Sequence, residues 1–304
     1  MVDGWIILDK PLEMGSTQGV AAVKRNLRQA GLGKCKVGHG GTLDPLATGV
    51  LPIAVGEATK LCGRMLDSNK IYAFTVTFGS ETDTLDLEGK VVAQSAVRPT
   101  LAALDGALGA FRCTLQQVPP AYSALMVDGK RAYDLARAGE AVDLPSRTIT
   151  IHDLTRDAFA GEEGAVESAT LTAHVSKGTY IRSLARDIAR AVGTVGHVTM
   201  LRRLKAGPFD IGQAISLDKL NDVGKGAPLE HILLPLEAGL VDIPALSLDP
   251  EQARAVRQGR VLTGLPFEDG LYWAKAGSVP VALVELSGGS LKVQRGFNLS
   301  DVAE

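Results

Sequence analysis

Cysteine is scarce in this chain of 304 residues. The cysteines, Cys35, Cys62 and Cys113, lie far apart in the sequence, and no CxxC pair occurs. This usage argues against a disulfide framework and against a structural zinc site. We therefore expect a protein of the reducing cytoplasm.

The chain also lacks the long apolar runs of membrane proteins. No stretch of about 18 apolar residues occurs, so we expect no transmembrane helix and no membrane partner. The N-terminal Met-Val-Asp-Gly-Trp carries an acid and lacks a basic n-region, which argues against a signal peptide. The length suffices for one large domain and a smaller second one, and a hydrophobic content of 45% is ordinary for a globular protein.

Several common catalytic motifs are missing as well. The run 39–41 (His-Gly-Gly) could line an esterase oxyanion hole, but the GxSxG nucleophile elbow that this requires is absent. No Gly-Lys pair is followed by Ser or Thr, and the glycines of 31–41 do not form GxGxxG, so neither nucleotide-binding loop is present. The histidines show no HExxH or other ligand spacing, and we expect no bound metal.

Charge is segregated along the chain although the net charge is only −2. Residues 14–43 contain basic side chains and no acid, and residues 177–207 contain Asp187 as their only acid. Acids gather instead in 81–88 and 162–167. Such segregation predicts a basic face, which is typical of a polyanion site, whereas solvated helix faces are the alternative interpretation.

Apolar periodicity and turn residues outline the secondary structure. The spacing predicts helices at about 16–30, 57–66, 179–192 and 250–259, and strands at 5–8, 50–55, 72–78, 147–154, 167–175, 270–275, 279–286 and 291–297. Ser16 or Thr17 is expected to cap the first helix. Pro52 favours an edge strand or a bulge, and Asp128-Gly129 indicates a hairpin turn.

The most regular helix is the one predicted at 179–192. Its apolar residues recur at i, i+3, i+4 and i+7, which predicts a buried stripe. A neighbouring stripe, which could contact phosphates, consists of Arg182, Arg186 and Arg190.

A single carboxylate, Asp44, lies within residues 38–52, whose other members are glycines, prolines, threonines, one histidine and apolar residues. Tight backbone turns would hold its side chain at a fixed position. Three functions stay open at this point: a turn cap, a base or nucleophile acting at a sugar or carbonyl carbon, and one acid of a glycosidase pair. The basic segments on both sides favour a polyanionic substrate.

The run 38–49 (GHGGTLDPLATG) resembles the catalytic motif of the TruB family of tRNA pseudouridine synthases. Further segments resemble blocks of that family in family order: 8–11, 56–60, 70–72, 119–130, 176–182 and 201–203. The C-terminal module resembles the PUA-like RNA-binding domain of the family. The sequence departs from the family pattern at Glu13, where a glycine is common, and at Gly15, where a hydroxyl residue is common, and this puts the local wall geometry in doubt.

The resemblance implies a set of site residues. Asp44 would be the essential acid that acts at C1′ of the target uridine, and Arg182 would pair with it and keep it ionised. Tyr72 would stack on the uracil and is a candidate base for a sugar proton. The other substrate-binding residues would be His39, which supports the flipped nucleotide, Tyr180 and Leu201, which line the base pocket, and Lys10, which with Pro11 shapes its wall.

The resemblance also implies a fold and a function. We expect an α+β protein in which residues 1–240 form the pseudouridine synthase fold, a mixed, largely antiparallel sheet flanked by helices, and residues 241–304 form a small β-rich PUA-like domain. It would convert uridine-55 in the T arm of tRNA into pseudouridine by flipping the base out of the stem-loop. The reaction needs no redox step and no external nucleophile, so we expect no cofactor, and we expect a monomer without a required protein partner.

Three alternatives stay open. The first is a guide-RNA-dependent relative, which usually works in a larger ribonucleoprotein and carries basic extensions. The second is a non-catalytic tRNA-folding chaperone that uses the same basic face. The third is a glycosidase, which would release uracil or hydrolyse a sugar bond.

Overall fold

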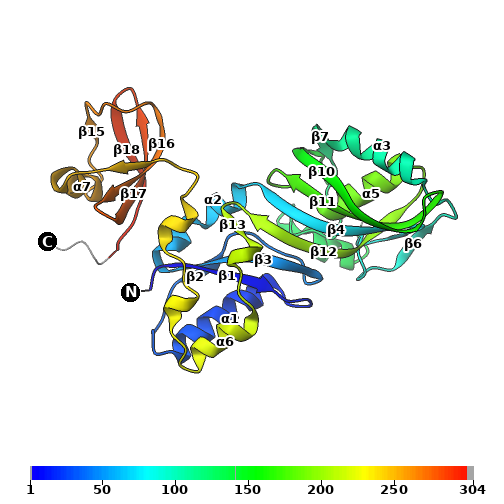
Figure 1. Cartoon of the computed structure of the whole chain (residues 1–304), viewed down its shortest axis with the longest axis horizontal. Coiled ribbons are helices and arrows are strands. Elements are labelled where there is room, and N and C mark those ends of the chain that lie inside the picture. The colour runs from blue at the N-terminus through cyan, green and yellow to red at the C-terminus, as the bar shows by residue number, and fades with distance from the viewer. Residues whose placement is uncertain (1, 141, 300–304) are drawn as a thin grey trace. The chain divides into compact units, whose positions relative to one another are not determined.

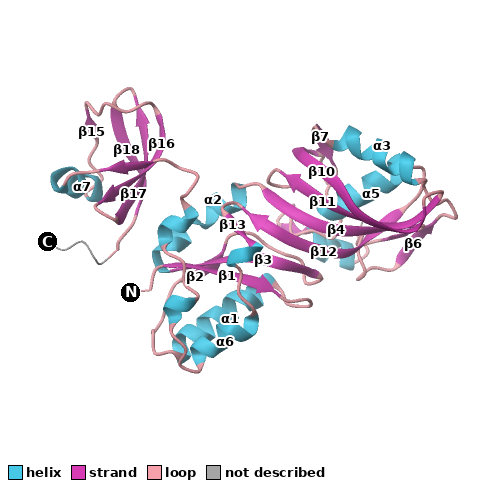
Figure 2. Ribbon diagram, viewed as in Figure 1, coloured by secondary structure: helices cyan, strands magenta, loops and turns pink. Residues whose placement is uncertain are grey.

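The computed structural model (Figures 1 and 2) describes residues 2–140 and 142–299. The chain divides into two compact units. Unit 1 consists of the described parts of Met1–Asp44, Val50–Leu66 and Ala206–Glu304, and unit 2 consists of Pro45–Gly49 and Asp67–Lys205. Strand β3 (Ala47–Val55) contributes residues to both units.

Unit 2 is built on long strands that lie in the order β12-β4-β11-β10-β7. These strands are β4 (Lys70–Phe78), β7 (Thr114–Gln117), β10 (Arg147–Glu162), β11 (Ala165–Val175) and β12 (Gly196–Ala206). β10 pairs antiparallel with β11 and β7, and β11 pairs antiparallel with β4. Residues 47–49 of β3 pair parallel with β12. The sheet is therefore mixed and largely antiparallel, as predicted.

Helices α3 (Leu101–Phe111) and α5 (Ile181–Ala191) pack against this sheet (Figure 1). The core that they bury contains Phe74, Val76, Phe78, Leu104, Leu108, Ile181, Leu184, Ala185 and Ile188. The predicted strand at 72–78 and the predicted apolar stripe of the 179–192 helix are thus confirmed.

The smaller elements of unit 2 form two hairpin-like pairs and a short helix. They are β5 (Ser80–Thr82), β6 (Val91–Gln94), β8 (Met126–Val127), β9 (Lys130–Arg131) and α4 (Ala132–Arg137). The turn between β8 and β9 has φ 50° at Asp128 and φ 81° at Gly129, so the predicted hairpin is confirmed.

In unit 1, the N-terminal strands and helices share a core with later segments. The elements are β1 (Gly4–Lys10), α1 (Ser16–Gln29), β2 (Val37–His39), η1 (Gly56–Leu61), α2 (Cys62–Asp67), β13 (Phe209–Asp210), η2 (Ile211–Gln213), α6 (Leu217–Gly224), η3 (Leu229–His231) and η4 (Leu236–Gly239). The core includes Trp5, whose ring centroid lies 5.1 Å from that of Phe209. Helix α1 approaches β1 and β3 closely, because a Cβ on Gly19 would lie 3.1 Å from a methyl carbon of Leu51.

The expectation that Pro52 marks an edge strand is wrong, whereas the alternative of a bulge stays a prediction. β3 lies next to β1 in the sheet, and its residues 53–55 pair antiparallel with β2. Pro52 has no N–H to give, but its carbonyl accepts a hydrogen bond from Gly40 N at 2.8 Å. The strand is therefore internal. Proline is tolerated at this position because its carbonyl still accepts a hydrogen bond, although it has no N–H to donate.

The C-terminal part of unit 1 forms a separate sheet in the order β14-β16-β17-β18-β15. Its elements are β14 (Ala245–Ser247), α7 (Pro250–Arg257), β15 (Leu262–Thr263), β16 (Gly270–Ala276), β17 (Val279–Ser287) and β18 (Ser290–Gly296). Asp249 caps α7 by accepting a hydrogen bond from Gln252 N at 2.8 Å. The predicted strands are confirmed, whereas the domain boundary between residues 240 and 241 stays a prediction. None of the helices in the described residues is long and apolar enough to cross a membrane.

Candidate active site

Asp44 lies in the loop between β2 and β3 and is partly buried. The loop is packed tightly, because a Cβ on Gly40 would lie only 2.6 Å from the Cβ of Met65 in α2. Gly41 has φ 144°, in the region that favours glycine. His39, the last residue of β2, pairs with Ile53 of β3. The glycines therefore hold the chain before Asp44 close to its neighbours, as the sequence predicted.

A buried hydroxyl fixes the residue that precedes Asp44. Ser16 Oγ donates to Leu43 O at 3.0 Å and accepts from Leu43 N at 2.8 Å. Ser16 and Leu43 are each 4% exposed, so these bonds are shielded from water. The sequence assigned Ser16 or Thr17 to the helix cap, and this is wrong: Gly15 is the cap residue of α1, and its N–H donates to Gln18 Oε1 at 2.6 Å.

Lys10 is fully buried and holds the loop between β1 and α1. Its Nζ donates to Met14 O at 2.6 Å and to Pro11 O at 3.0 Å. Within this loop Glu13 has φ 64°, a left-handed conformation that is rare for a residue with a Cβ. The loop geometry thus explains why a glycine suits position 13, whereas the part of Lys10 in the wall of the base pocket stays a prediction.

Tyr72 and Leu201 belong to unit 2. Tyr72 lies on β4, where it pairs with Ala173 of β11, and Leu201 lies on β12. Both are partly buried and pack against the core beneath α5. The fold thus places in one unit two of the residues that the resemblance assigns to the base pocket.

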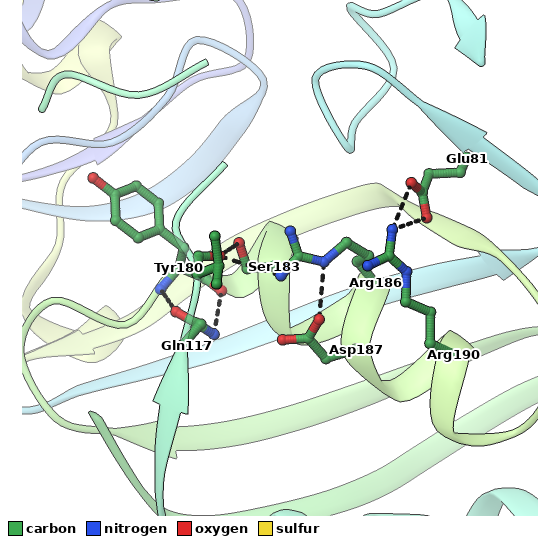
Figure 3. Close-up of polar contacts among 8 residues, drawn as sticks. Glu81, Gln117, Tyr180, Ser183, Arg186, Asp187 and Arg190 are labelled. Atoms are coloured by element: carbon green, nitrogen blue, oxygen red, sulfur yellow. Dashed lines mark hydrogen bonds and ion pairs between the residues drawn. The ribbon is translucent and has the colours of Figure 1, made fainter. Parts of the chain in front are cut away.

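Tyr180 is the N-terminal cap residue of α5, and the buried side-chain amide of Gln117 hydrogen-bonds to its backbone (Figure 3). Gln117 Oε1 accepts from Tyr180 N at 2.8 Å, and Gln117 Nε2 donates to Tyr180 O at 3.2 Å. Gln117 is 1% exposed. The amide gives the Tyr180 N–H an acceptor at the helix N-terminus, where the regular helix supplies none, and adds a second donor to the Tyr180 carbonyl, which also accepts from Leu184 N at 3.0 Å. In Figure 3 the aromatic ring of Tyr180 points away from Gln117.

Arg182 is buried in unit 2, and its guanidinium is surrounded by oxygen acceptors. Its Nη1 lies 3.2 Å from Asp86 Oδ2 and donates to Thr84 O at 2.8 Å, while Nη2 donates to Tyr122 O at 3.1 Å. The segment between β5 and β6 therefore supplies a buried carboxylate, that of Asp86, to this arginine. Sequence reasoning missed Asp86, because nothing in the spacing reveals which charges a loop turns inward.

The predicted stripe of phosphate-binding arginines stays a prediction, and each of its guanidinium groups has an acidic partner within unit 2. Arg182 is only 7% exposed. Arg186 Nε donates to Asp187 Oδ1 at 2.8 Å, and Arg190 Nη2 donates to Glu81 Oε1 at 3.0 Å (Figure 3). The two more exposed arginines of the stripe therefore carry ion pairs with acids of the same unit, and the Arg190 side chain is 56% exposed.

Lys70, which begins β4 within the family-like block 70–72, is a further buried cation, and the sequence assigned it no role. Burial, together with the neighbouring positive charges of Arg203 and Lys177, lowers its pKa to about 8, although Asp67 opposes the shift. Its Nζ donates to Ser68 O at 2.6 Å.

The site residues divide between the two units. Unit 1 carries Lys10, His39 and Asp44, and unit 2 carries Tyr72, Tyr180, Arg182 and Leu201. The pairing of Arg182 with Asp44 joins the two units and stays a prediction. Among the described residues, no group of three or more His, Cys, Asp or Glu side chains is placed to hold a metal ion.

Sequence comparison assigns most of the chain to one family. Residues 25–181 match the N-terminal domain of the TruB family pseudouridylate synthases, and residues 182–241 match the tRNA pseudouridylate synthase B C-terminal domain. The chain belongs to the TruB family of pseudouridine synthases. It is therefore an isomerase, and the family resemblance seen in the sequence is confirmed.

Individual TruB-family relatives match over the full length. A protein of Novosphingobium aromaticivorans named tRNA pseudouridine synthase B is 84% identical over 304 residues, which is all of both chains. A protein of the same name from Zymomonas mobilis is 57% identical over 295 residues, covering 97% of this chain and 96% of its own.

Solved structures support the fold class. A structure described as an H/ACA RNP bound to a substrate RNA containing 2′-deoxyuridine matches with a TM-score of 0.73 at 23% identity, over 98% of this chain and 86% of that chain. A Cbf5 chain from an archaeal box H/ACA sRNP Nop10–Cbf5 complex matches with a TM-score of 0.72 at 23% identity, over 98% and 87%. At this identity the likeness concerns the fold, and it confirms the predicted pseudouridine synthase fold.

Proposed function

We propose that this TruB-family enzyme converts uridine-55 in the T arm of tRNA into pseudouridine, with Asp44 as its essential acid. The substrate class is supported by the name tRNA pseudouridine synthase B, which the 84% identical relative carries over its full length. The role of Asp44 is supported by its loop, in which buried glycines and the Ser16 hydroxyl fix the backbone just before the carboxylate.

The reaction is an isomerisation that residues of this chain can serve. The bond between C1′ and N1 of the uridine breaks, the uracil turns without leaving the site, and a new bond joins C1′ to C5. The proton released from C5 is balanced by the proton that N1 gains, so no oxidant or second substrate is consumed. Asp44 would act at C1′ as the bond to N1 breaks.

The target base must leave its stem-loop before this chemistry can occur. Flipping a base requires a few kcal/mol of unstacking, and stacking on an aromatic side chain returns about 1–3 kcal/mol. Tyr72 would stack on the uracil and is the candidate base for a sugar proton, Tyr180 and Leu201 would line its pocket, and His39 would support the flipped nucleotide. We propose that the enzyme does this as a cytoplasmic monomer without a protein partner.

The test is incubation with an unmodified T stem-loop in the absence of guide RNA, followed by chemical mapping of pseudouridine. The wild-type enzyme should yield product at the T-loop uridine, and Asp44→Asn should yield none while retaining the wild-type melting temperature. Lack of product in the wild type would refute the substrate assignment, and released uracil would point to a glycosidase. Product from Asp44→Asn would remove Asp44 from its role, whereas a chaperone would keep its effect on tRNA folding in that variant.

A further inference from the structure

Arg147 lies beside the Tyr180 ring and is not used by the proposed chemistry. It is the first residue of β10, where it pairs with Gln117 of β7. Its guanidinium carbon lies 5.6 Å from the centroid of the Tyr180 ring. The side chain also runs along the open backbone of Gly178, where a Cβ would lie 3.4 Å from Arg147 Nη1.

The Arg147 side chain lacks the partner that its charge requires. In residues 2–140 and 142–299 it makes no hydrogen bond or ion pair through its guanidinium, and its Nε is buried without an acceptor. The arginines of α5 differ, since Arg182, Arg186 and Arg190 each pair with a carboxylate. A partly buried guanidinium is unfavourable unless its donors are satisfied, so the chemistry at Arg147 favours an anion from outside the chain.

We propose that Arg147 binds a phosphodiester group of the substrate RNA, next to the nucleotide that Tyr180 contacts. This inference rests on the proposed function, because it takes RNA as the substrate. A guanidinium matches a phosphate through two parallel N–H donors. The contact with the Tyr180 ring orients the group through a cation–π interaction, which leaves the edge of the guanidinium to meet the phosphate.

The pairing of β7 with β10 couples this phosphate site to the base pocket. Gln117 holds the backbone of Tyr180, and Arg147, its partner across the two strands, contacts the ring of the same tyrosine. A phosphate bound by Arg147 is therefore placed at a fixed position relative to Tyr180. The site would select for the backbone geometry of a nucleotide whose base has left the stack.

The experiment measures the affinity for a T stem-loop at several salt concentrations. Loss of one phosphate contact reduces the slope of log K against log salt by roughly 0.7–1. Arg147→Gln should show this smaller slope together with affinity reduced by roughly 10-fold at low salt, and Arg147→Lys should keep the slope because it keeps the charge. Arg156→Gln is the matched control, since Arg156 already pairs with Asp105 through two hydrogen bonds of 2.7 and 2.9 Å and should leave the slope unchanged.

The outcomes separate this inference from the function on which it rests. Unchanged affinity in Arg147→Gln, or reduced affinity with an unchanged slope, would overturn the phosphate site, because a purely structural contact with Tyr180 does not change ion release. If Arg147→Gln does not fold, the wild-type protein is tested instead with stem-loops that each carry one neutral methylphosphonate linkage. A neutral linkage at one of the positions should reduce the slope. If none of the positions reduces the slope, the inference is overturned. Product formation by the wild type tests the proposed function separately.

Discussion

Replacing Ser16 with alanine removes both hydrogen bonds that hold Leu43, at 2.8 and 3.0 Å. Leu43 is 4% exposed, so its N–H and C=O would lose their partner without ready access to water. An unpaired buried group costs about 1–3 kcal/mol, so the loss of a partner for two groups predicts a destabilisation of about 2 kcal/mol or more. At about 2–4 °C per kcal/mol for a protein of this size class, the melting temperature should fall by at least about 4 °C.

The same substitution should also reduce turnover, because Asp44 follows Leu43 directly. A displacement of about 1 Å at a reacting group can reduce the rate by about 100-fold. We therefore expect Ser16→Ala to reduce kcat by about 10- to 100-fold while KM for the T stem-loop stays close to the wild-type value. Single-turnover assays below the melting temperature separate this effect from unfolding.

Two further variants make the result decisive. Ser16→Thr retains the hydroxyl and should recover kcat relative to Ser16→Ala. Thr194→Val removes a different buried hydroxyl, which donates to Val97 O at 2.9 Å, and should destabilise the protein without lowering kcat. The reasoning is refuted if Ser16→Ala turns over at the wild-type rate, or if Thr194→Val loses kcat to the same extent.

Two other variants test local features of the fold. Glu13→Gly should raise the melting temperature, because φ 64° at Glu13 is a conformation that costs a residue with a Cβ about 1–2 kcal/mol; a lower melting temperature would contradict this explanation. Lys70→Met should flatten the pH dependence of stability between pH 8 and 10.5, because the pKa of Lys70 falls to about 8 in the folded state from its usual 10.5. The unfolded state then binds more protons across this window, so wild-type stability gains from Lys70 as the pH rises; urea titrations that give both proteins the same pH slope would refute it.

The regular elements of this chain were predictable because each one carries its own periodic signal. The apolar residues of α5 recur at helical spacing, and those of β4 alternate, so burial on one face decides both structures locally. The Asp128-Gly129 turn was equally readable, since its positive φ angles demand such residues. These features depend on a few neighbouring residues and on nothing distant.

The wrong predictions concern contacts between distant segments. Ser16 has the right chemistry for a helix cap, but its hydroxyl reaches a loop 27 residues away. Proline is typical of edge strands, but the strand that contains Pro52 is internal, and the Pro52 carbonyl accepts a hydrogen bond from Gly40 N. Local sequence cannot reveal these outcomes, because each depends on which remote group the fold brings near.

Two buried side chains, those of Ser16 and Gln117, hydrogen-bond to the backbone beside or at residues that are proposed to act on the substrate. Ser16 bonds both polar groups of Leu43, next to Asp44, and Gln117 bonds both polar groups of Tyr180. Each supplies one donor and one acceptor, so Ser16 fixes a loop residue and Gln117 fixes the residue at which α5 begins. Such segments can carry reactive side chains at defined positions without being rigid by themselves. Replacement of Ser16 or Gln117 should therefore reduce catalysis by more than the number of lost hydrogen bonds suggests.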